Sequence, residues 1–268
     1  MGLPRETIEE ILYFHHEDLS TLKACSLTCR TLFSVVRGLI HARVRLSVQR
    51  NYPPCKLVDR IAAKVLPGRR ATEDWYEVHM RCLSTVGKYG LSGYVREVDI
   101  ETGQTLAPKT LEAYLPYFRS FAQVHTLKIS GVDLARFLPA FGRYFGQFVP
   151  NLRSLHLPDL MGGAREILEF ICKFPHLNDL SLIPRSPHYY VGLPPRLSME
   201  HSPPLRGTLV LKGWRSIPVR FLLKIPGGLH FRSINAGGVD KEEMGGVLVA
   251  CSSDLEVFSL RCQWRKFT

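Results

Sequence analysis

The segment Asn151-Leu152-Arg153-Ser154-Leu155-His156-Leu157 decides the fold, because its apolar spacing returns along the chain. Its leucines form the pattern Leu-x-x-Leu-x-Leu, which is typical of a short buried strand. The pattern, with Val, Ile or Phe at some positions, also begins at Val95, Val124, Leu177 and Leu255, in a drifted form at Leu205, and weakly over residues 229–234. The middle apolar positions are 98, 127, 155, 180, 209, 234 and 258, which are 29, 28, 25, 29, 25 and 24 residues apart. Intervals this regular predict internal structural repeats.

The intervals between these strands contain stretches with helical periodicity. Three apolar faces are present: Leu111, Leu115 and Phe118; Leu134, Phe137, Leu138, Phe141, Phe145 and Phe148; and Ile167, Leu168 and Ile171. A unit of one strand and one helix buries its strand only by stacking on its neighbours. The spacing resembles that of leucine-rich repeats, which implies a curved α/β solenoid.

One position departs from the leucine-rich-repeat pattern. The residue three places after the last strand leucine is usually Asn or Cys in that family, and here it is Val132, Leu160 or Arg185. In leucine-rich repeats, the Asn residues of successive repeats form a ladder whose side chains hydrogen-bond to buried backbone groups at the turn. We therefore expect irregular turns rather than a regular horseshoe.

The first forty-five residues are predicted to be helical. Pro4 suits the first turn of a helix, and Ile8, Ile11 and Leu12 then form one apolar stripe. After a polar break at residues 15–18, either Asp18 or Ser20 can cap a second helical stretch. The apolar positions of this stretch are Leu22, Cys25, Cys29, Leu32, Phe33 and Val36, and its length predicts two helices that meet near residues 28–34. Because about forty residues cannot bury a self-sufficient core, the stripes require a partner or a neighbouring domain.

This segment resembles the F-box, particularly the F-boxes that occur in large sets in mushroom-forming fungi. The resemblance rests on Leu3-Pro4-x-Glu6-x-Ile8-x-x-Ile11-Leu12, on Asp18, and on the segment Thr21-Leu22-Lys23-Ala24-Cys25-Ser26-Leu27-Thr28-Cys29-Arg30. Two positions depart from the family pattern: Leu32 replaces a typical Trp, and His15 replaces an apolar residue.

The resemblance implies that the module binds a Skp-family adaptor, and through it a cullin scaffold. The residues that it assigns to the adaptor interface are Leu3, Pro4, Ile8, Ile11 and Leu12, supported by Leu22, Leu27 and Leu32. Each of these residues can instead belong to the module's own core, and some can serve both roles.

The predicted fold class lies between α+β and α/β. A helical F-box module over residues 1–45 is followed by a connecting region over 46–94 and by an irregular strand–helix solenoid over 95–268. Helices are predicted near 59–66 and 75–86, and a proline-rich stretch over 184–204 predicts an exposed insertion between repeats. The chain ends eight residues after Leu260, so we expect either a fragment or a frayed end.

Composition narrows the class of protein. The 268 residues are 45% apolar and 22% charged, which is ordinary globular composition. No apolar run is long enough to cross a membrane, and no signal peptide is recognisable, so we expect a protein of the cytoplasm or nucleus. Seven scattered cysteines without a Cys-x-x-Cys motif indicate reduced, mostly buried thiols, with neither a disulfide framework nor a zinc site.

No motif indicates catalysis or a cofactor. The chain has no nucleophile elbow, phosphate loop, dinucleotide fingerprint or paired-histidine zinc motif. His125, His156 and His176 fall in or beside repeat strands, where one or two of them can line a binding surface.

Two functions are therefore compatible with the sequence. The first is a substrate receptor of a Skp, cullin and F-box ubiquitin ligase, in which the repeats bind a target protein of unknown identity. The second is a stand-alone repeat scaffold with a vestigial F-box, attracted to a polyanion by its net charge of +11. The basic residues form only loose runs, so we do not expect a nucleic-acid-binding protein.

Overall fold

The computed structural model describes residues 4–15, 18–47, 83, 86, 90–101, 116–131, 133–160, 163–184, 203–213, 219–239 and 241–261. Three N-terminal helices, α1 (Arg5–Tyr13), α2 (Leu19–Ser26) and α3 (Arg30–His41), precede a parallel sheet that alternates with helices. The strands are β1 (Arg43–Ser47), β2 (Glu97–Glu101), β3 (Thr126–Ser130), β4 (Ser154–Leu160), β5 (Asp179–Pro184), β6 (Leu205–Lys212), β7 (Leu229–Gly237) and β8 (Val257–Arg261). The α-helices between them are α7 (Leu134–Tyr144), α8 (Ala164–Ile171) and α9 (Lys241–Cys251), and the short 3₁₀ helices are η1 (Leu91–Tyr94), η2 (Gly146–Phe148) and η4 (Val219–Lys224).

The sheet has the order of a solenoid. Its eight described strands lie side by side in chain order, β1 to β8, and every neighbouring pair is parallel. The predicted middle positions of the repeats are aligned with one another across the sheet: Val98, Leu127, Leu155, Leu180, Leu209, Ile234 and Phe258. This register confirms the predicted repeats and the α/β solenoid fold.

The drifted repeat at β6 lies beside an irregularity in the sheet. Its sequence holds one residue more between the first two leucines than the other repeats do, and the register of β6 against β7 shifts between Gly207 and Thr208. Gly207 has a φ of 81° there. Because Gly207 pairs with Phe231 and Thr208 pairs with Ser233, the extra residue of this bulge is Arg232 on β7. Leu209 is nevertheless aligned with Leu180 on one side and with Ile234 on the other.

The sheet begins earlier than the sequence analysis predicts. Strand β1 was not among the predicted repeats, yet it pairs with β2 from Arg43 to Ser47. It therefore crosses the predicted boundary between residues 45 and 46 and joins the helical module directly to the solenoid. With only Val44 and Leu46 as apolar positions, β1 lacks the first leucine of the repeat pattern, which is why the pattern does not detect it.

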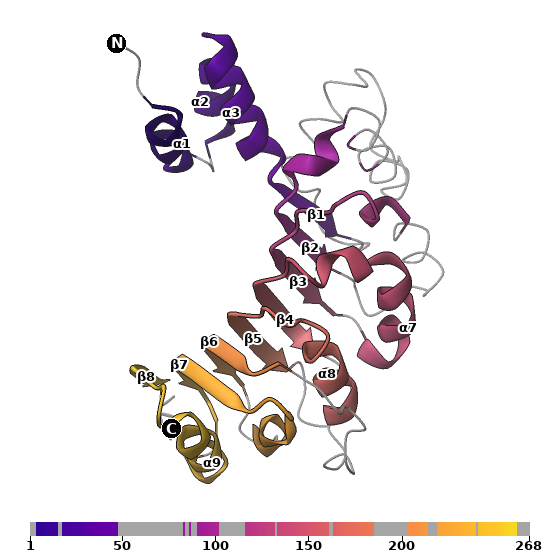
Figure 1. Cartoon of the computed structure of the whole chain (residues 1–268), viewed down its shortest axis with the longest axis vertical. Helices are drawn as coiled ribbons and strands as arrows, with labels where there is room; N and C mark the ends of the chain where they lie inside the picture. The colour runs from indigo at the N-terminus through magenta and orange to yellow at the C-terminus, as the bar shows by residue number, and fades with distance from the viewer. Residues whose placement is uncertain are drawn as a thin grey trace, which may run out of the picture.

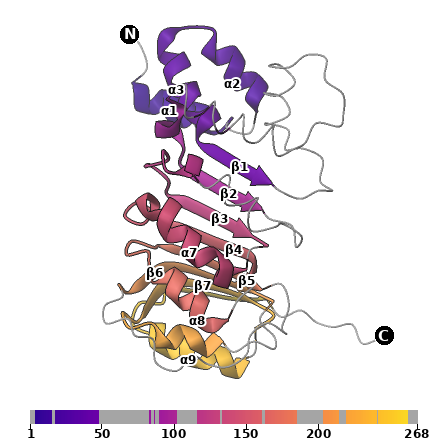
Figure 2. The ribbon, with the colours of Figure 1, turned by 90° about the vertical axis from the view of Figure 1, so that its right-hand side faces the viewer.

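Helices line the outer side of the curved sheet and strands line its inner side (Figure 1). Viewed from the helix side, α7, α8 and α9 lie in front of the strands (Figure 2). The layer between helices and strands contains stacked aromatic rings. Phe141 contacts the rings of Phe137, Phe145, Phe170 and Phe174 at centroid distances of 5.9, 5.3, 4.8 and 5.6 Å. These rings connect successive repeats through the core.

Side-chain amides satisfy the backbone of the preceding turn. The Nε2 of Gln147 donates to the carbonyl oxygen of Phe118 at 2.6 Å, and the Nδ2 of Asn151 donates to that of Ala122 at 2.8 Å. Both bonds span 29 residues, the interval of one repeat. At these two places, the amides satisfy buried backbone carbonyl groups, as an Asn ladder does in regular repeats. Neither Gln147 nor Asn151 stands at the ladder position of the repeat pattern.

The helical module has its own small core. Leu12, Leu22, Val35 and Val36 are buried together, and Ile8, Cys25, Leu32, Leu39 and Ile40 pack against them. Helix α2 begins at Asp18, whose carboxylate accepts hydrogen bonds from the backbone N–H groups of Ser20 and Thr21. Asp18 is therefore the cap, one of the two predicted candidates, and Pro4 precedes α1 directly. The joint between α2 and α3 lies at residues 27–29, at the start of the predicted range.

The module is attached to the first repeats by defined contacts. The backbone N–H groups of Arg96 and Glu97 both donate to the carbonyl oxygen of Ala42, at 2.7 and 2.9 Å. The guanidinium of Arg37 lies over the ring of Tyr94, 5.7 Å from its centroid. Helix α3 therefore leads into the sheet without a separate linker.

Several predictions fall on residues that are not described. These are the helix over 59–66, most of the helix over 75–86, the apolar residues Leu111 and Leu115, most of the proline-rich stretch and the residues after 261. Leu83, from the predicted helix at 75–86, is described and is buried in the main core. Among the residues with described placement, no helix is long and apolar enough to cross a membrane.

Candidate interaction surfaces

The N-terminal module exposes large apolar side chains at two places. Ile11 and Phe14 lie at the end of α1, with 48% and 85% of their surface exposed. Leu27, which is 87% exposed, ends α2, and Phe33, which is 51% exposed, lies on α3. We call these four residues the apolar rim. Exposed groups of large apolar side chains on a small helical module are typical of a protein-binding surface.

The predicted adaptor-binding residues divide between this rim and the core. Leu12 and Leu22 are buried within the module, so they support the surface without forming it. The placement of the other predicted residues is as follows: Ile11 and Leu27 belong to the rim, Pro4 is exposed, Ile8 and Leu32 are partly buried against the module's core, and Leu3 lies outside the described residues.

Sequence reasoning missed Phe14 and misjudged Phe33. Phe14 stands three residues after Ile11, so the apolar stripe of α1 continues by one helical step, and this spacing was the available signal. Phe33 was assigned to the apolar period of the second helical stretch, but half of its surface is exposed. Helical periodicity identifies an apolar face without showing which neighbour covers it.

A groove separates the module from the first repeats. It has a volume of about 600 Å³ and is lined by residues of α1, α3 and η1, among them Glu10, Phe14, Leu39 and Tyr94. Because Phe14 belongs to both the groove and the apolar rim, the two features are continuous.

The inner face of the sheet is polar, in contrast to the rim. On β2, the apolar residues Val98 and Ile100 alternate with Glu97, Asp99 and Glu101, which point away from the helices. Most other strands show the same alternation, with exceptions such as Val210 on β6 and Val257 on β8. The polar residues align across strands into rows. The middle row, as the register defines it, contains Arg45, Asp99, Lys128, His156, Ser181, Val210, Asn235 and Ser259.

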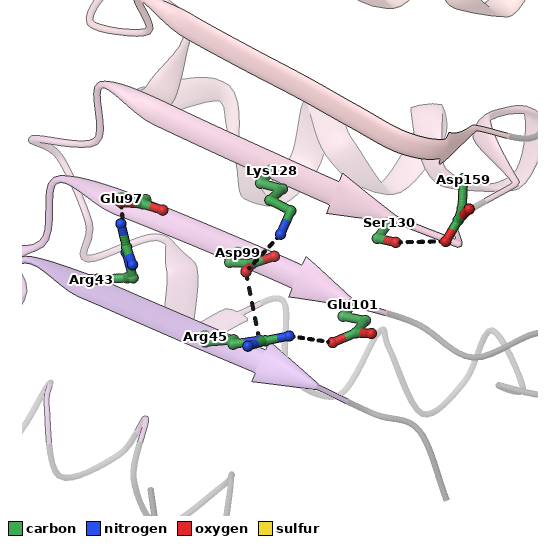
Figure 3. Close-up of polar contacts among 8 residues, drawn as sticks. All are labelled: Arg43, Arg45, Glu97, Asp99, Glu101, Lys128, Ser130 and Asp159. Atoms are coloured by element: carbon green, nitrogen blue, oxygen red, sulfur yellow. Dashed lines mark hydrogen bonds and ion pairs between the residues drawn. The ribbon is translucent and has the colours of Figure 1, made fainter. Parts of the chain in front are cut away.

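Ion pairs organise the first three strands of this face (Figure 3). Arg43 pairs with Glu97 at 2.7 Å, and Arg45 pairs with Glu101 at 2.8 Å. Lys128 pairs with the Oδ2 atom of Asp99 at 3.3 Å, and Arg45 lies 3.6 Å from the same atom. In every pair the carboxylate is less exposed than its cation.

Two of the three predicted histidines lie off the polar face, since His125 and His176 are exposed in the turns before β3 and β5. His156 stands in the middle row, where burial lowers the pKa of its imidazole below 6.5. The carboxylates of Asp179, Glu97 and Asp99 act in the opposite direction, and Lys128 adds to the lowering. His156 is therefore a neutral hydrogen-bonding group at pH 7.

The four described cysteines are free thiols that differ in burial. Cys172 and Cys251 are buried, whereas Cys29 is exposed and Cys25 is partly buried. The Sγ atom of Cys29 accepts a hydrogen bond from the N–H of Leu32 at 3.5 Å, so this residue caps α3. Among the described residues, no group of three or more metal-ligating side chains is gathered at one place.

Compared with known proteins, the chain matches no family model, and no curated protein matches it.

Proposed function

We propose that the protein is the substrate receptor of a Skp, cullin and F-box type of ubiquitin ligase. The N-terminal module binds the Skp-family adaptor, and the inner face of the solenoid binds the target. The receptor needs no active site of its own, because it accelerates ubiquitin transfer by holding the target close to the recruited conjugating enzyme. Such a complex operates in the cytoplasm or the nucleus.

The apolar rim is the observation that carries this proposal. Phe14 and Leu27 are almost fully exposed on a module whose sequence resembles the F-box, and water is an unfavourable environment for both side chains. Burying two such residues against a partner contributes roughly 1.5–3 kcal/mol each. The core of Leu12, Leu22, Val35 and Val36 supports the rim, so the surface is present before the adaptor arrives.

The experiment is coexpression of the full chain with a Skp-family adaptor, followed by purification through a tag on the adaptor. The proposal predicts that the wild-type chain copurifies and that the double variant Phe14→Ser/Leu27→Ser does not. A matched control is Leu223→Ser/Val249→Ser, which removes two exposed apolar residues near the other end of the solenoid and should leave copurification intact.

The outcomes separate the two candidate functions. If the soluble wild-type chain does not copurify, the receptor function is wrong. The net charge of +11 then favours the scaffold, which predicts retention on heparin with a steep dependence on salt.

A further inference from the structure

Two buried hydrogen-bond acceptors on the inner face of the solenoid have no donor among the residues that the structure describes. They are the Oδ1 atom of Asp99 on β2 and the Oδ1 atom of Asn235 on β7. Asp99 is more than nine-tenths buried, and it projects from the polar face between Arg45 and Lys128 (Figure 3). Buried acceptors are rarely left without donors in native proteins, so both atoms indicate that a group from outside the chain completes the face.

The neighbouring ion pairs of Asp99 use its Oδ2 atom and not its Oδ1 atom. Lys128 and Arg45 both approach the Oδ2 atom, at 3.3 and 3.6 Å. Only 8% of the surface of the Asp99 side chain is exposed, against 40% for Lys128. The carboxylate is therefore held in position through its Oδ2 atom, and no donor among the described residues reaches its buried Oδ1 atom.

The charge balance of this region favours a cation as that ligand. The described side chains on the polar face of β1 to β5 include three cations, Arg43, Arg45 and Lys128, and four carboxylates, Glu97, Asp99, Glu101 and Asp179. The carboxylate of Asp179 accepts a hydrogen bond from the hydroxyl of Ser154 rather than from a cation. The face therefore carries more carboxylates than cations here, so added positive charge improves its balance, although the chain as a whole carries a net charge of +11.

The two unpartnered acceptors lie in one row. Asp99 and Asn235 both belong to the middle row, five strand intervals apart, and Lys128, His156, Ser181 and Val210 lie between them. Adjacent strands are about 4.8 Å apart, so the row is about 24 Å long. An extended polypeptide advances about 3.3 Å per residue, so seven or eight residues cover that distance.

We propose that this row binds an extended polypeptide segment that carries an arginine or lysine, with the cationic group seated on Asp99. A backbone or side-chain donor of the same segment satisfies Asn235. The inference rests on the proposed function, because it names the chemical class of the target that the receptor recognises.

The test uses the full chain and labelled ten-residue peptides in a Gly/Ser/Ala background, with one position fixed as Arg, Lys, Leu or Glu. Fluorescence anisotropy should show that the best Arg or Lys peptide binds at least tenfold more tightly than the Leu and Glu peptides. The variant Asp99→Asn, which keeps the shape of the side chain, should abolish this preference. Its control is Glu169→Gln, which removes a carboxylate paired with Arg165 on the helix side and should leave the preference unchanged.

A second variant keeps the test decisive if Asp99→Asn does not fold. Val210→Lys leaves the ion pairs of β1 to β3 intact and places a cation beside Asn235 in the middle row, under the bound segment, so it should weaken the binding of Arg and Lys peptides at least tenfold. A preference for Glu peptides, equal binding of all four classes, or a basic preference that survives both variants would overturn the proposal. Adaptor copurification, measured on the same preparations, should be unaffected by either variant, which separates this inference from the proposed function.

Discussion

The carbonyl oxygen of Asn178 lies against the Cα atom of Gly207, so closely that a β-carbon at Gly207 would collide with it. The same carbonyl accepts a hydrogen bond from the N–H of Thr208 at 2.6 Å, which holds β6 close to the start of β5. Only glycine fits at this point, because the contact is with backbone and the φ of 81° is unfavourable for other residues.

Gly207→Ala should therefore lower the free energy of unfolding by about 3 kcal/mol or more, through steric overlap and backbone strain together. The matched variant is Gly213→Ala, which has a φ of 77° but open space around the added methyl group. It should cost only about 1–2 kcal/mol. Urea unfolding of both variants checks the pair, and equal losses would show that the contact with Asn178 does not matter.

The aromatic layer predicts a large effect at Phe141. Its ring is stacked on that of Phe145 with an interplanar angle of 6°, and it meets Phe170 edge-on, so it connects α7 to α8. Phe141→Ala should cost about 3–5 kcal/mol, and Phe141→Leu should cost clearly less because most of the volume is kept. Thermal unfolding measures both variants. A small effect of the alanine variant would mean that the repeats do not depend on this layer.

The pH dependence of stability should reveal His156. Burial lowers the pKa of its imidazole in the folded state below the ordinary 6.5, so between these two pKa values the unfolded state binds more protons. The contribution of neutral His156 to the free energy of unfolding is therefore fully present above pH 6.5 and is lost as the pH falls below that value. Urea unfolding at pH 7.5 and at pH 5.5 should show a smaller loss for His156→Gln than for the wild type, because His41 and His125, which have pKa values shifted the same way, remain. An identical loss in both proteins would contradict the burial of His156.

Two leucines of the module should separate folding from binding. Leu22 is completely buried, so Leu22→Ala should cost about 2–5 kcal/mol of stability. Leu27 is 87% exposed, so Leu27→Ser should change stability by no more than about 0.5 kcal/mol and should weaken adaptor binding. Circular dichroism melts and adaptor copurification together measure the two effects. A strongly destabilised Leu27→Ser variant would show that this residue belongs to the module's fold.

Sequence periodicity was sufficient to predict the solenoid because the repeats from β2 to β7 bury the same positions, whereas Phe258 and Leu260 of β8 are exposed. Leu127, Leu155 and Leu180 recur at nearly equal intervals and meet across the sheet, so one-dimensional spacing carries the three-dimensional register. Strand β1 was not predicted, because it lacks the first leucine of the Leu-x-x-Leu-x-Leu pattern. The side-chain hydrogen bonds of Gln147 and Asn151 were not predicted either, because their acceptors are backbone carbonyl groups one repeat earlier, which no local sequence pattern marks.

The residues that form the candidate surfaces were harder to predict from the sequence. An apolar stripe identifies Ile11, Leu12 and Phe33 alike, although Leu12 is buried and the other two are largely exposed. The difference depends on how three short helices pack, which spacing does not specify. The ion pairs of Asp99 likewise arise from residues 29 and 54 positions away, Lys128 and Arg45, which only the parallel register brings together.

Titration calorimetry of the purified full chain with a purified Skp-family adaptor measures whether the N-terminal module binds the adaptor. We expect saturable binding of one adaptor per chain, with an affinity that changes little between low and high salt, because the proposed contact is made by the apolar rim. We also expect Phe14→Ser/Leu27→Ser to abolish the heat of binding while the chain stays folded. Absence of binding by the folded wild-type chain, or undiminished binding by the double variant, would contradict the proposed function.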